Sequence, residues 1–247
     1  MALASARAET SFKDELGIRL WGGLFKADMY DMQRFAMAQN DQMVSGGWEG
    51  DFKVGNLTRG AGAGIELSWG VLPDVRVVAA VEGRGVSAGG DYRNVAGQEA
   101  TLSSGLSACG VEGGATFLLR SFEDWCRINL TVRAGAHRLY WSYIGYEETG
   151  PSGDISSSTK LQSMAPGGMV GLEWEWLTPV PSLPFPLTGF ILAGYRFLSF
   201  SKIDYVTDSG GTRDTGVLEG PDGKWISMDF SGPEVRFGLQ IVLLLKQ

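Results

Sequence analysis

The amino-acid sequence predicts an all-β fold, an antiparallel up-and-down barrel of eight strands, and three observations support this prediction. Apolar and polar residues alternate over eight segments, which is the period of a β-strand. Glycine makes up 36 of the 247 residues, and aromatic residues are frequent at 11%. Long and short connections alternate between the segments, as in an up-and-down barrel with one elaborate rim. We expect residues 9–247 to form this single barrel domain.

The expected strands follow one another in chain order, each with one apolar and one polar side. Short turns join three pairs of them, at 72–74, 121–125 and 178–186, and long polar connections join the other four pairs. An even number of strands places both chain ends on the side of the short turns. The expected strands are 15–25, 61–71, 75–84, 102–119, 126–140, 167–177, 187–200 and 234–246.

Soluble barrels and membrane barrels show the same alternation of apolar and polar residues, so the alternation cannot distinguish them. The types of residue on the polar side can. Its cations are arginines, with no lysine before Lys246, and its acids are glutamates. A surface washed by solvent would include lysine, whereas the guanidinium fork suits enclosed ion pairs with carboxylates. We therefore expect a polar network in the barrel lumen, made of Arg19, Glu66, Arg76, Glu82, Arg84, Glu112, Arg127, Arg133, Glu173, Glu175, Arg196, Glu234 and Arg236.

The opposite side carries no charge over about nine to eleven residues, enough for a tilted strand to cross a bilayer. No apolar run reaches the roughly 18 residues of a spanning helix, so a helical membrane protein is excluded. We expect a transmembrane barrel with short periplasmic turns and long outward loops, and a soluble lipocalin-like carrier is the alternative. The expected lipid-facing residues are Ile18, Leu20, Leu67, Trp69, Val77, Phe117, Leu130, Leu172, Trp174, Ile191, Phe237, Leu239 and Ile241.

This architecture resembles the small outer-membrane β-barrels of Gram-negative bacteria, such as OmpX, the OmpA transmembrane domain and OmpW, without matching any single one of these families. The resemblance covers nearly the whole chain and implies a location in the bacterial outer membrane. It also implies an assembly signal in the last strand, with a polar residue, a glycine two positions on and hydrophobic residues at five and seven. Arg236, Gly238, Ile241 and Leu243 fit this spacing, although aliphatic residues replace the usual aromatics and the chain continues to Gln247.

The first residues, 1–8, contain Ala6-Arg7-Ala8, which has the small-x-small form of a signal-peptidase site. The basic and apolar parts of a signal peptide are missing upstream of this site. We interpret residues 1–8 as the remnant of a truncated signal peptide of an exported protein, or as a disordered tail.

His137 is the single histidine of the chain, and it falls on the inward side of its strand near the loop end. The resemblance gives it a candidate catalytic role, because lipid-A-modifying enzymes of this fold use a His–Ser pair at that rim. Ser107 and Ser142 are available, but no motif fixes either one. We expect no enzymatic activity, no cofactor and no metal site.

The two cysteines lie on neighbouring strands, and the turn between the strands sets a register that places Cys109 opposite residue 136. At about 3.3 Å per residue, the sulfur of Cys126 is then too far away for a disulfide. We expect two free thiols that face lipid. The same register places Glu112 opposite Arg133 as an ion pair.

Two of the long loops have a recognisable composition. The first, 26–60, contains an amphipathic segment at 27–44 that predicts a short helix. It is either an apolar lid or a helix packed on the barrel rim, and we favour packing. The loop at 202–229 is rich in acids but lacks the spacing of a calcium loop, which favours a solvated surface. The helix carries Met29, Met32, Met37 and Met43, and the loop carries Asp204, Asp208, Asp214, Glu219, Asp222 and Asp229.

The net charge of −7 argues against a nucleic-acid partner, which requires a basic face. Eight strands leave room for little more than side chains inside the barrel. We therefore expect a structural or surface-interaction role, in which a closed, charge-filled barrel presents four long loops. The alternatives are a narrow channel or port for small hydrophobic molecules and a lipid-A-modifying enzyme. Outer-membrane lipid and lipopolysaccharide are expected partners, with a protein or surface polymer at the loops.

Overall fold

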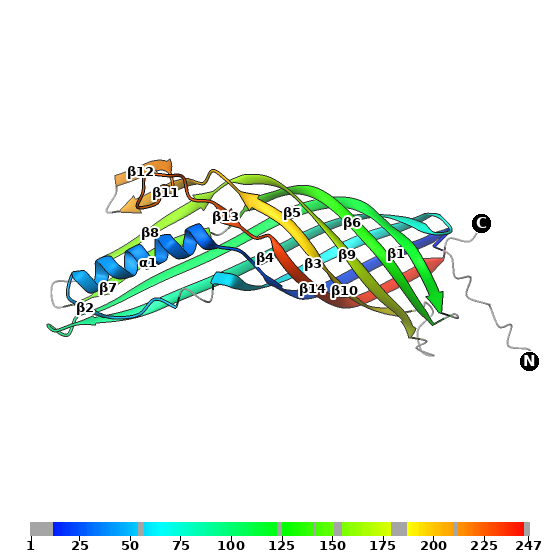
Figure 1. Ribbon diagram of the computed structural model, residues 1–247, viewed down its shortest axis with the longest axis horizontal. Coiled ribbons are helices and arrows are strands. Elements are labelled where there is room, and N and C mark those ends of the chain that lie inside the picture. The colour runs from blue at the N-terminus through cyan, green and yellow to red at the C-terminus, as the bar shows by residue number, and fades with distance from the viewer. Residues whose placement is uncertain are drawn as a thin grey trace, which may run out of the picture.

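The computed structural model describes residues 12–53, 57–122, 125–140, 142–150, 155–178, 187–209 and 212–244. Eight strands form a closed antiparallel ring, because β14 pairs with β1 as well as with β10 (Figure 1). This ring confirms the predicted eight-stranded up-and-down barrel. In ring order its strands are β1 (Glu15–Lys26), β3 (Arg59–Leu72), β4 (Val75–Asn94), β5 (Glu99–Phe122), β6 (Cys126–Leu139), β9 (Met164–Thr178), β10 (Leu187–Phe200) and β14 (Gly232–Leu244).

One end of the barrel, the short-turn end, carries the tight connections. The first strand of the ring begins there and the last strand ends there. Glu15 at the start of β1 lies opposite Leu244 at the end of β14, and β3 turns into β4 within a few residues. The amide of Phe12 donates to the carbonyl of Pro73 across this end (2.8 Å). Gly70 leaves room for the Phe12 carbonyl, since a Cβ at this position would lie 1.4 Å from its oxygen. Residues 179–186 of the turn predicted at 178–186, and the segment 1–8, lie outside the described residues.

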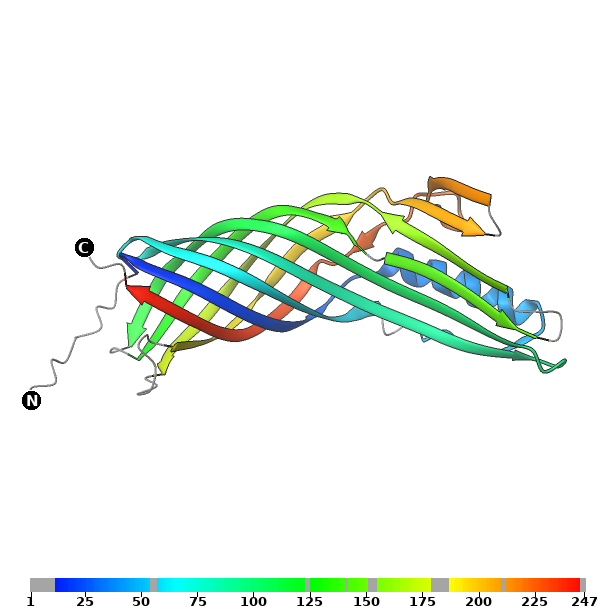
Figure 2. The same cartoon turned by 180° about the vertical axis from the view of Figure 1, so that it is seen from behind.

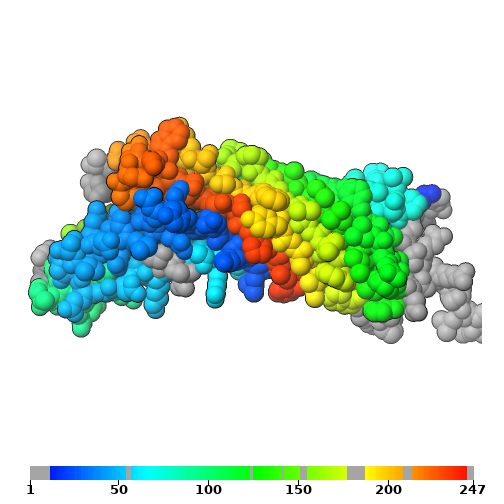
Figure 3. Space-filling model, in the orientation of Figure 1, coloured from blue at the N-terminus to red at the C-terminus, as the bar shows by residue number. Residues whose placement is uncertain are grey.

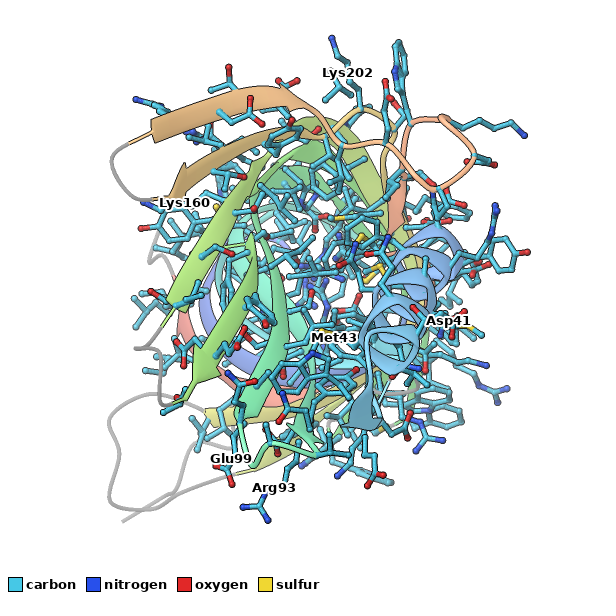
Figure 4. All side chains as sticks on the ribbon, turned by 90° about the vertical axis from the view of Figure 1, so that its left-hand side faces the viewer. Asp41, Met43, Arg93, Glu99, Lys160 and Lys202 are labelled. Carbon is cyan, nitrogen blue, oxygen red and sulfur yellow. The ribbon has the colours of Figure 1, made fainter. Side chains whose placement is uncertain are left out.

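The other end, the loop end, carries a helix and six short strands. β7, β8, β11 and β12 extend the wall outward from β5 in that order, and α1 lies across the interior from β7 and β8 (Figures 2 and 4). No described helix is long and apolar enough to cross a membrane. The elements are α1 (Tyr30–Ser45), β2 (Trp48–Gly50), β7 (Ser142–Thr149), β8 (Ile155–Gln162), β11 (Asp204–Ser209), β12 (Thr212–Val217) and β13 (Met228–Asp229).

The connection between β4 and β5 differs from the prediction of a long loop. Both strands continue through 85–94 and 99–101, and the ladder between them reaches the pair Arg93↔Glu99. The turn is short, with Gly97 at φ 77° and the side chain of Asn94 accepting hydrogen bonds from two backbone amides. The alternation continues here, but the polar side chains now point outward and the apolar ones inward, so the pattern of the preceding strand does not predict this hairpin.

The register of β5 and β6 also differs from the prediction. Cys109 lies opposite Arg138, and Glu112 lies opposite Gly135, so the predicted Glu112–Arg133 pair is wrong. The strands run on to the pair Phe122↔Cys126, and a bulge after Leu118 shifts the count. The slip is two residues, so every side chain keeps its predicted face. Both cysteines are free and half-buried on the outer face.

A change of polarity along β4 shows where the barrel changes its surroundings. From Val75 to Arg84, the inward side chains include arginine and glutamate while the outward ones are valine, alanine and glycine. From Gly85 to Asn94, the inward side chains are Val86, Ala88, Gly90 and Tyr92, and the outward ones end in Asp91 and Arg93. The barrel therefore has a charged interior behind an apolar outer belt near the short turns. Near the loop end it has an apolar core behind a polar outer face.

Candidate functional site

The lumen of the barrel is the first feature that a function can use. All thirteen charged residues expected there are buried, with exposed fractions from 0% to 8%, and they come from every strand of the ring. Each follows the inward parity of its strand. Glu15 joins them at 7% exposed, although the prediction omitted it; its parity with Arg19 on β1 was the available signal. Among the described residues, the lumen then holds seven arginines and seven glutamates, whose formal charges balance.

The short-turn cluster is the first of two groups of ion pairs in this lumen. Arg19 on β1 donates to both oxygens of Glu173 on β9 (2.6 and 3.0 Å) and is paired with Glu175. Arg76 on β4 reaches the same two carboxylates (2.6 and 2.5 Å). Asn129 on β6 donates to both of them as well (3.1 Å each). Side chains from widely spaced strands therefore meet on the barrel axis.

Phe12 covers this cluster at the short-turn end. Its ring is fully buried and lies under the guanidinium of Arg76 at 4.6 Å and that of Arg127 at 5.2 Å. Arg127 is held in turn by Glu15 through two hydrogen bonds (3.1 and 2.8 Å). An aromatic face beneath arginines adds a favourable cation–π contact and excludes water. The lumen is closed at this end.

The loop-side cluster is the second group of ion pairs. Arg196 on β10 contacts Glu82 (3.0 Å), Glu234 (2.9 Å) and Glu112. Arg236 binds Glu82 and Glu234 (2.8 and 2.7 Å). Arg84 binds the same two glutamates (2.7 and 3.2 Å). Three arginines and three glutamates are thus shared among strands β4, β5, β10 and β14.

Glu66 on β3 links Arg133 on β6 to the short-turn cluster. It pairs with Arg133 (2.5 Å) and with Arg19 (3.3 Å). Fully buried ion pairs of this kind persist only when each charge is matched, because an unmatched charge costs several kcal/mol. The two clusters together place long, buried charged side chains along the lumen from Phe12 to the loop-side cluster.

His137 lies at the loop-side edge of this network and is 1% exposed. Its Nε2 is 3.2 Å from Glu112 and its Nδ1 is 4.0 Å from Glu82. The hydroxyl of Ser142 instead exchanges hydrogen bonds with the backbone of Ser107 (2.9 Å each). In the described part of the chain no hydrogen bond joins either serine to His137, so the structure does not assemble the His–Ser pair.

Glu82, Glu112 and His137 are close enough to hold a metal ion, with candidate ligand atoms within 4.8 Å of one another. The guanidinium of Arg196 already occupies oxygens of both carboxylates, and Arg84 and Arg236 also bind Glu82. A divalent cation would therefore add positive charge to carboxylates that are already neutralised. We assign no metal to this group.

The outer belt contains the residues predicted to face lipid. Eleven of the thirteen are 38% to 60% exposed, and Leu130 and Ile241 are half-buried on the same outer face. In β14, Arg236 and Gly238 face the lumen while Ile241 and Leu243 face outward. Their assembly role stays a prediction.

The loop-end core closes the interior above the charged lumen. It is lined by buried apolar side chains such as Leu106, Leu139, Leu198, Phe200 and Phe230. α1 covers one side of this region (Figure 3). The four methionines of this segment take different positions. Met29, just before α1, and Met32 are buried, and Met37 is 56% exposed. Met43 is half-buried toward the interior (Figure 4).

A pocket of about 510 Å³ lies beside this core, between α1 and strands β7, β8 and β11. Phe35, Leu102 and Ile144 line its apolar side, and Tyr146 and Tyr205 add hydroxyl groups. Tyr146 donates to Glu148 (2.7 Å). Burial first, and then this hydrogen bond, raise the pKa of the Tyr146 phenol to about 12.

The acids predicted in the 202–229 loop do not gather in the described structure. Asp214 accepts a hydrogen bond from Tyr205 (3.1 Å), and Asp222 lies 3.6 Å from Arg34. Asp229 accepts from the backbone amide of Ser231 (2.9 Å). The side chain of Asp208 lies outside the described residues.

A closed eight-stranded barrel with an ion-paired lumen and an apolar outer belt defines the class of integral β-barrel proteins. Among solved structures, the chain is similar to the outer membrane protein OprG from Pseudomonas aeruginosa. The TM-score is 0.50 at 7% identity, covering 94% of this chain and 97% of that one. This likeness concerns the fold.

Two further similar structures have lower scores. Ail, the attachment invasion locus protein of Yersinia pestis, has a TM-score of 0.37 at 10% identity and covers 94% of this chain and 99% of its own. The outer membrane protease OmpT from Escherichia coli has a TM-score of 0.34 at 11% identity and covers 93% and 97%. No family model and no curated protein matches the sequence.

Proposed function

We propose that this protein is a sealed anchor in a bacterial outer membrane, which holds a folded module at the cell surface for interaction with a partner. The carrying observation is the lumen network, in which seven arginines and seven glutamates are buried and ion-paired across the barrel. The apolar belt supports residence in a bilayer, because charged side chains on that face would be costly. In this orientation the short turns face the periplasm and the loop end faces outward.

The loop end supports the interaction role. It has its own apolar core, so it is a folded unit and not a set of loose loops. Its outer face carries polar residues such as Asp91, Arg93 and Glu99. A rigid platform of this kind can present a defined surface to a protein or a surface polymer.

Conductance measurements test the sealed lumen. The full chain, folded in detergent and inserted in planar bilayers, should give no steady conductance. A variant that carries Arg19→Ser and Arg196→Ser should give stable openings, because it removes one central arginine from each of the two clusters. Arg93→Ser is the matched control, since Arg93 is an exposed arginine outside the lumen. Steady openings of the parent protein would contradict the proposal.

Membrane residence has a separate test. The chain should require detergent or lipid to fold, and the folded form should migrate differently from the heated form on a gel. A chain that is folded and soluble without detergent would favour the carrier alternative.

The second candidate function is a port for small hydrophobic molecules, and the pocket beside the loop-end core favours it. Saturation-transfer NMR with indole can detect such binding. Leu102→Gln places an amide in the pocket wall and should abolish the signal. Leu119→Gln, on the outer face near the short-turn end, should leave it unchanged. An equal signal in all three proteins would show partition into detergent only.

A further inference from the structure

A groove of about 430 Å³ lies on the outside of the wall, where β5 changes its neighbour from β6 to β7. β6 ends at Leu139, and the amide of Tyr140 donates to Ser107 of β5 (2.7 Å). β7 then resumes the ladder at Tyr143, opposite Gly105. This break in the ladder leaves the hollow between the outward side chains of β6, β7 and β8.

The lining of the groove combines apolar surface with two cations. Tyr140 and Tyr143 are 48% and 41% exposed, and the buried Leu161 contributes to its floor. Arg138 on β6 and Lys160 on β8 lie along the same groove. Figure 4, seen along the barrel from the loop end, shows Lys160 on the outside of the wall.

Neither cation is neutralised by a residue that the structure describes. Within the described ranges, no carboxylate lies within ion-pair distance of Arg138 or Lys160, and the groove lining contains no acid. Arg93, another exposed cation on the outer face, is paired with Glu99 (2.5 Å). An unpaired arginine and lysine beside apolar surface match a ligand that carries both a phosphate and a hydrocarbon chain.

The height of the groove narrows the choice of ligand. The outward residues of β6 up to Ala136 are apolar or cysteine, and Arg138 is the first charge after them. Elsewhere in the ring, Lys26 on β1 and Arg59 on β3, which lie opposite each other, likewise end the belt. The groove therefore sits at the edge of the belt on the loop-end side, at the depth of lipid headgroups.

We propose that this groove binds a phosphorylated glycolipid of the outer leaflet, the lipid A part of lipopolysaccharide. Arg138 and Lys160 hold a phosphate by charge-assisted hydrogen bonds. An acyl chain lies against Tyr140, Tyr143 and Leu161, and the aromatic rings sit at the interface between chain and headgroup. The site is outside the barrel, so it is independent of whether the lumen conducts.

Native mass spectrometry of the detergent-solubilised full chain tests the site by titration with purified lipid A. The double variant Arg138→Gln/Lys160→Gln should bind lipid A about tenfold more weakly or worse, because each cation contributes to phosphate binding. Arg120→Gln is the matched control, since it removes an exposed cation at the short-turn edge of the belt. It should leave the affinity unchanged.

Two further arms use the parent protein. Lipid A from which both phosphates have been removed should bind the parent protein weakly. Its affinity should equal that of intact lipid A for the double variant. Phosphatidylglycerol should bind more weakly than lipid A. The proposal is overturned if the double variant retains full affinity, or if phosphatidylglycerol or dephosphorylated lipid A binds the parent as tightly as lipid A.

Discussion

The two halves of this barrel solve the same packing problem with opposite side chains. Near the short turns, charged residues fill the interior and apolar residues cover the outside. Near the loop end, apolar residues fill the interior and polar residues cover the outside. β4 and β5 run through both halves without a break, so one strand carries both patterns in succession.

The comparison shows that the surroundings of a strand, and not its period, decide which side chains point inward. In contact with lipid the outside must be apolar, and the interior can hold charges only if they are paired. In water the apolar side chains move inside, where their burial stabilises the fold by about 25 cal/mol per Å². The reversal between Arg84 and Val86 on β4 is therefore where we expect the edge of the bilayer.

Removal of Arg196 should give the largest loss of stability among the tests of this difference. Arg196→Ala leaves Glu82, Glu112 and Glu234 short of a shared partner in a buried cluster. The free energy of unfolding should fall by about 3 to 5 kcal/mol. Denaturant unfolding in lipid vesicles, followed by tryptophan fluorescence, measures the change.

Arg93→Ala at the loop end is the control for that measurement. Arg93 forms an ion pair of similar length with Glu99, but both side chains are more than 60% exposed. Its removal should cost about 1 kcal/mol or less. Equal losses in the two variants would show that burial does not distinguish the two halves.

A charge placed on the outer face of β4 is the second test. Val81→Arg puts a guanidinium in the belt at a position that is 61% exposed, and should reduce stability in vesicles by about 2 to 4 kcal/mol. Ser87→Arg has the same parity on the same strand, about 20 Å further along. It should cost little, because this position lies in water.

The outcome at Ser87 decides where the belt ends. A loss equal to that of Val81→Arg would place position 87 inside the bilayer, and the boundary would have to move toward the loop end. The groove lined by Arg138 and Lys160 would then no longer lie at headgroup depth.

The sequence was sufficient for the ring and for the faces of its strands, because side-chain parity is a local property. Arg19 and Glu173 could be placed in the lumen without knowledge of their pairing. The partners themselves could not be predicted, since Arg19 meets residues of β9 that are 154 positions away. Which rows meet across the barrel depends on strand tilt and stagger, and these are properties of the closed ring.

Two predictions are wrong, one in each half of the barrel. The segment from Gly85 to Thr101 is a hairpin and not the predicted loop, because its polar and apolar sides are exchanged relative to the strands before it. The predicted pairing of Glu112 is wrong because, near the short-turn end, the ladder runs on to the pair Phe122↔Cys126 and a bulge after Leu118 changes the register. Neither the edge of the bilayer nor a bulge has a residue motif of its own.

The position of Phe12 over the short-turn cluster could not be predicted either. A single aromatic residue before the first strand does not indicate where its side chain will lie.

The smallest expected effect concerns how far water is excluded from the loop-end interior. The pKa of Tyr146, which lines the pocket, reports on this. This pKa is raised from the ordinary 10 to about 12, chiefly by burial and then by the hydrogen bond to Glu148. A raised folded-state pKa means that this contribution to stability is complete below pH 10 and is lost as the pH rises toward 12. The pKa values of Tyr92 and Tyr205 are also raised, by burial in the first and by the hydrogen bond to Asp214 in the second. Ultraviolet titration of the phenols should therefore show a late component that Tyr146→Phe reduces relative to the parent protein. Glu148→Gln should lower the pKa of Tyr146 only partly, because burial, the larger cause, remains; a full return to 10 would show that the pocket is as wet as the outer surface.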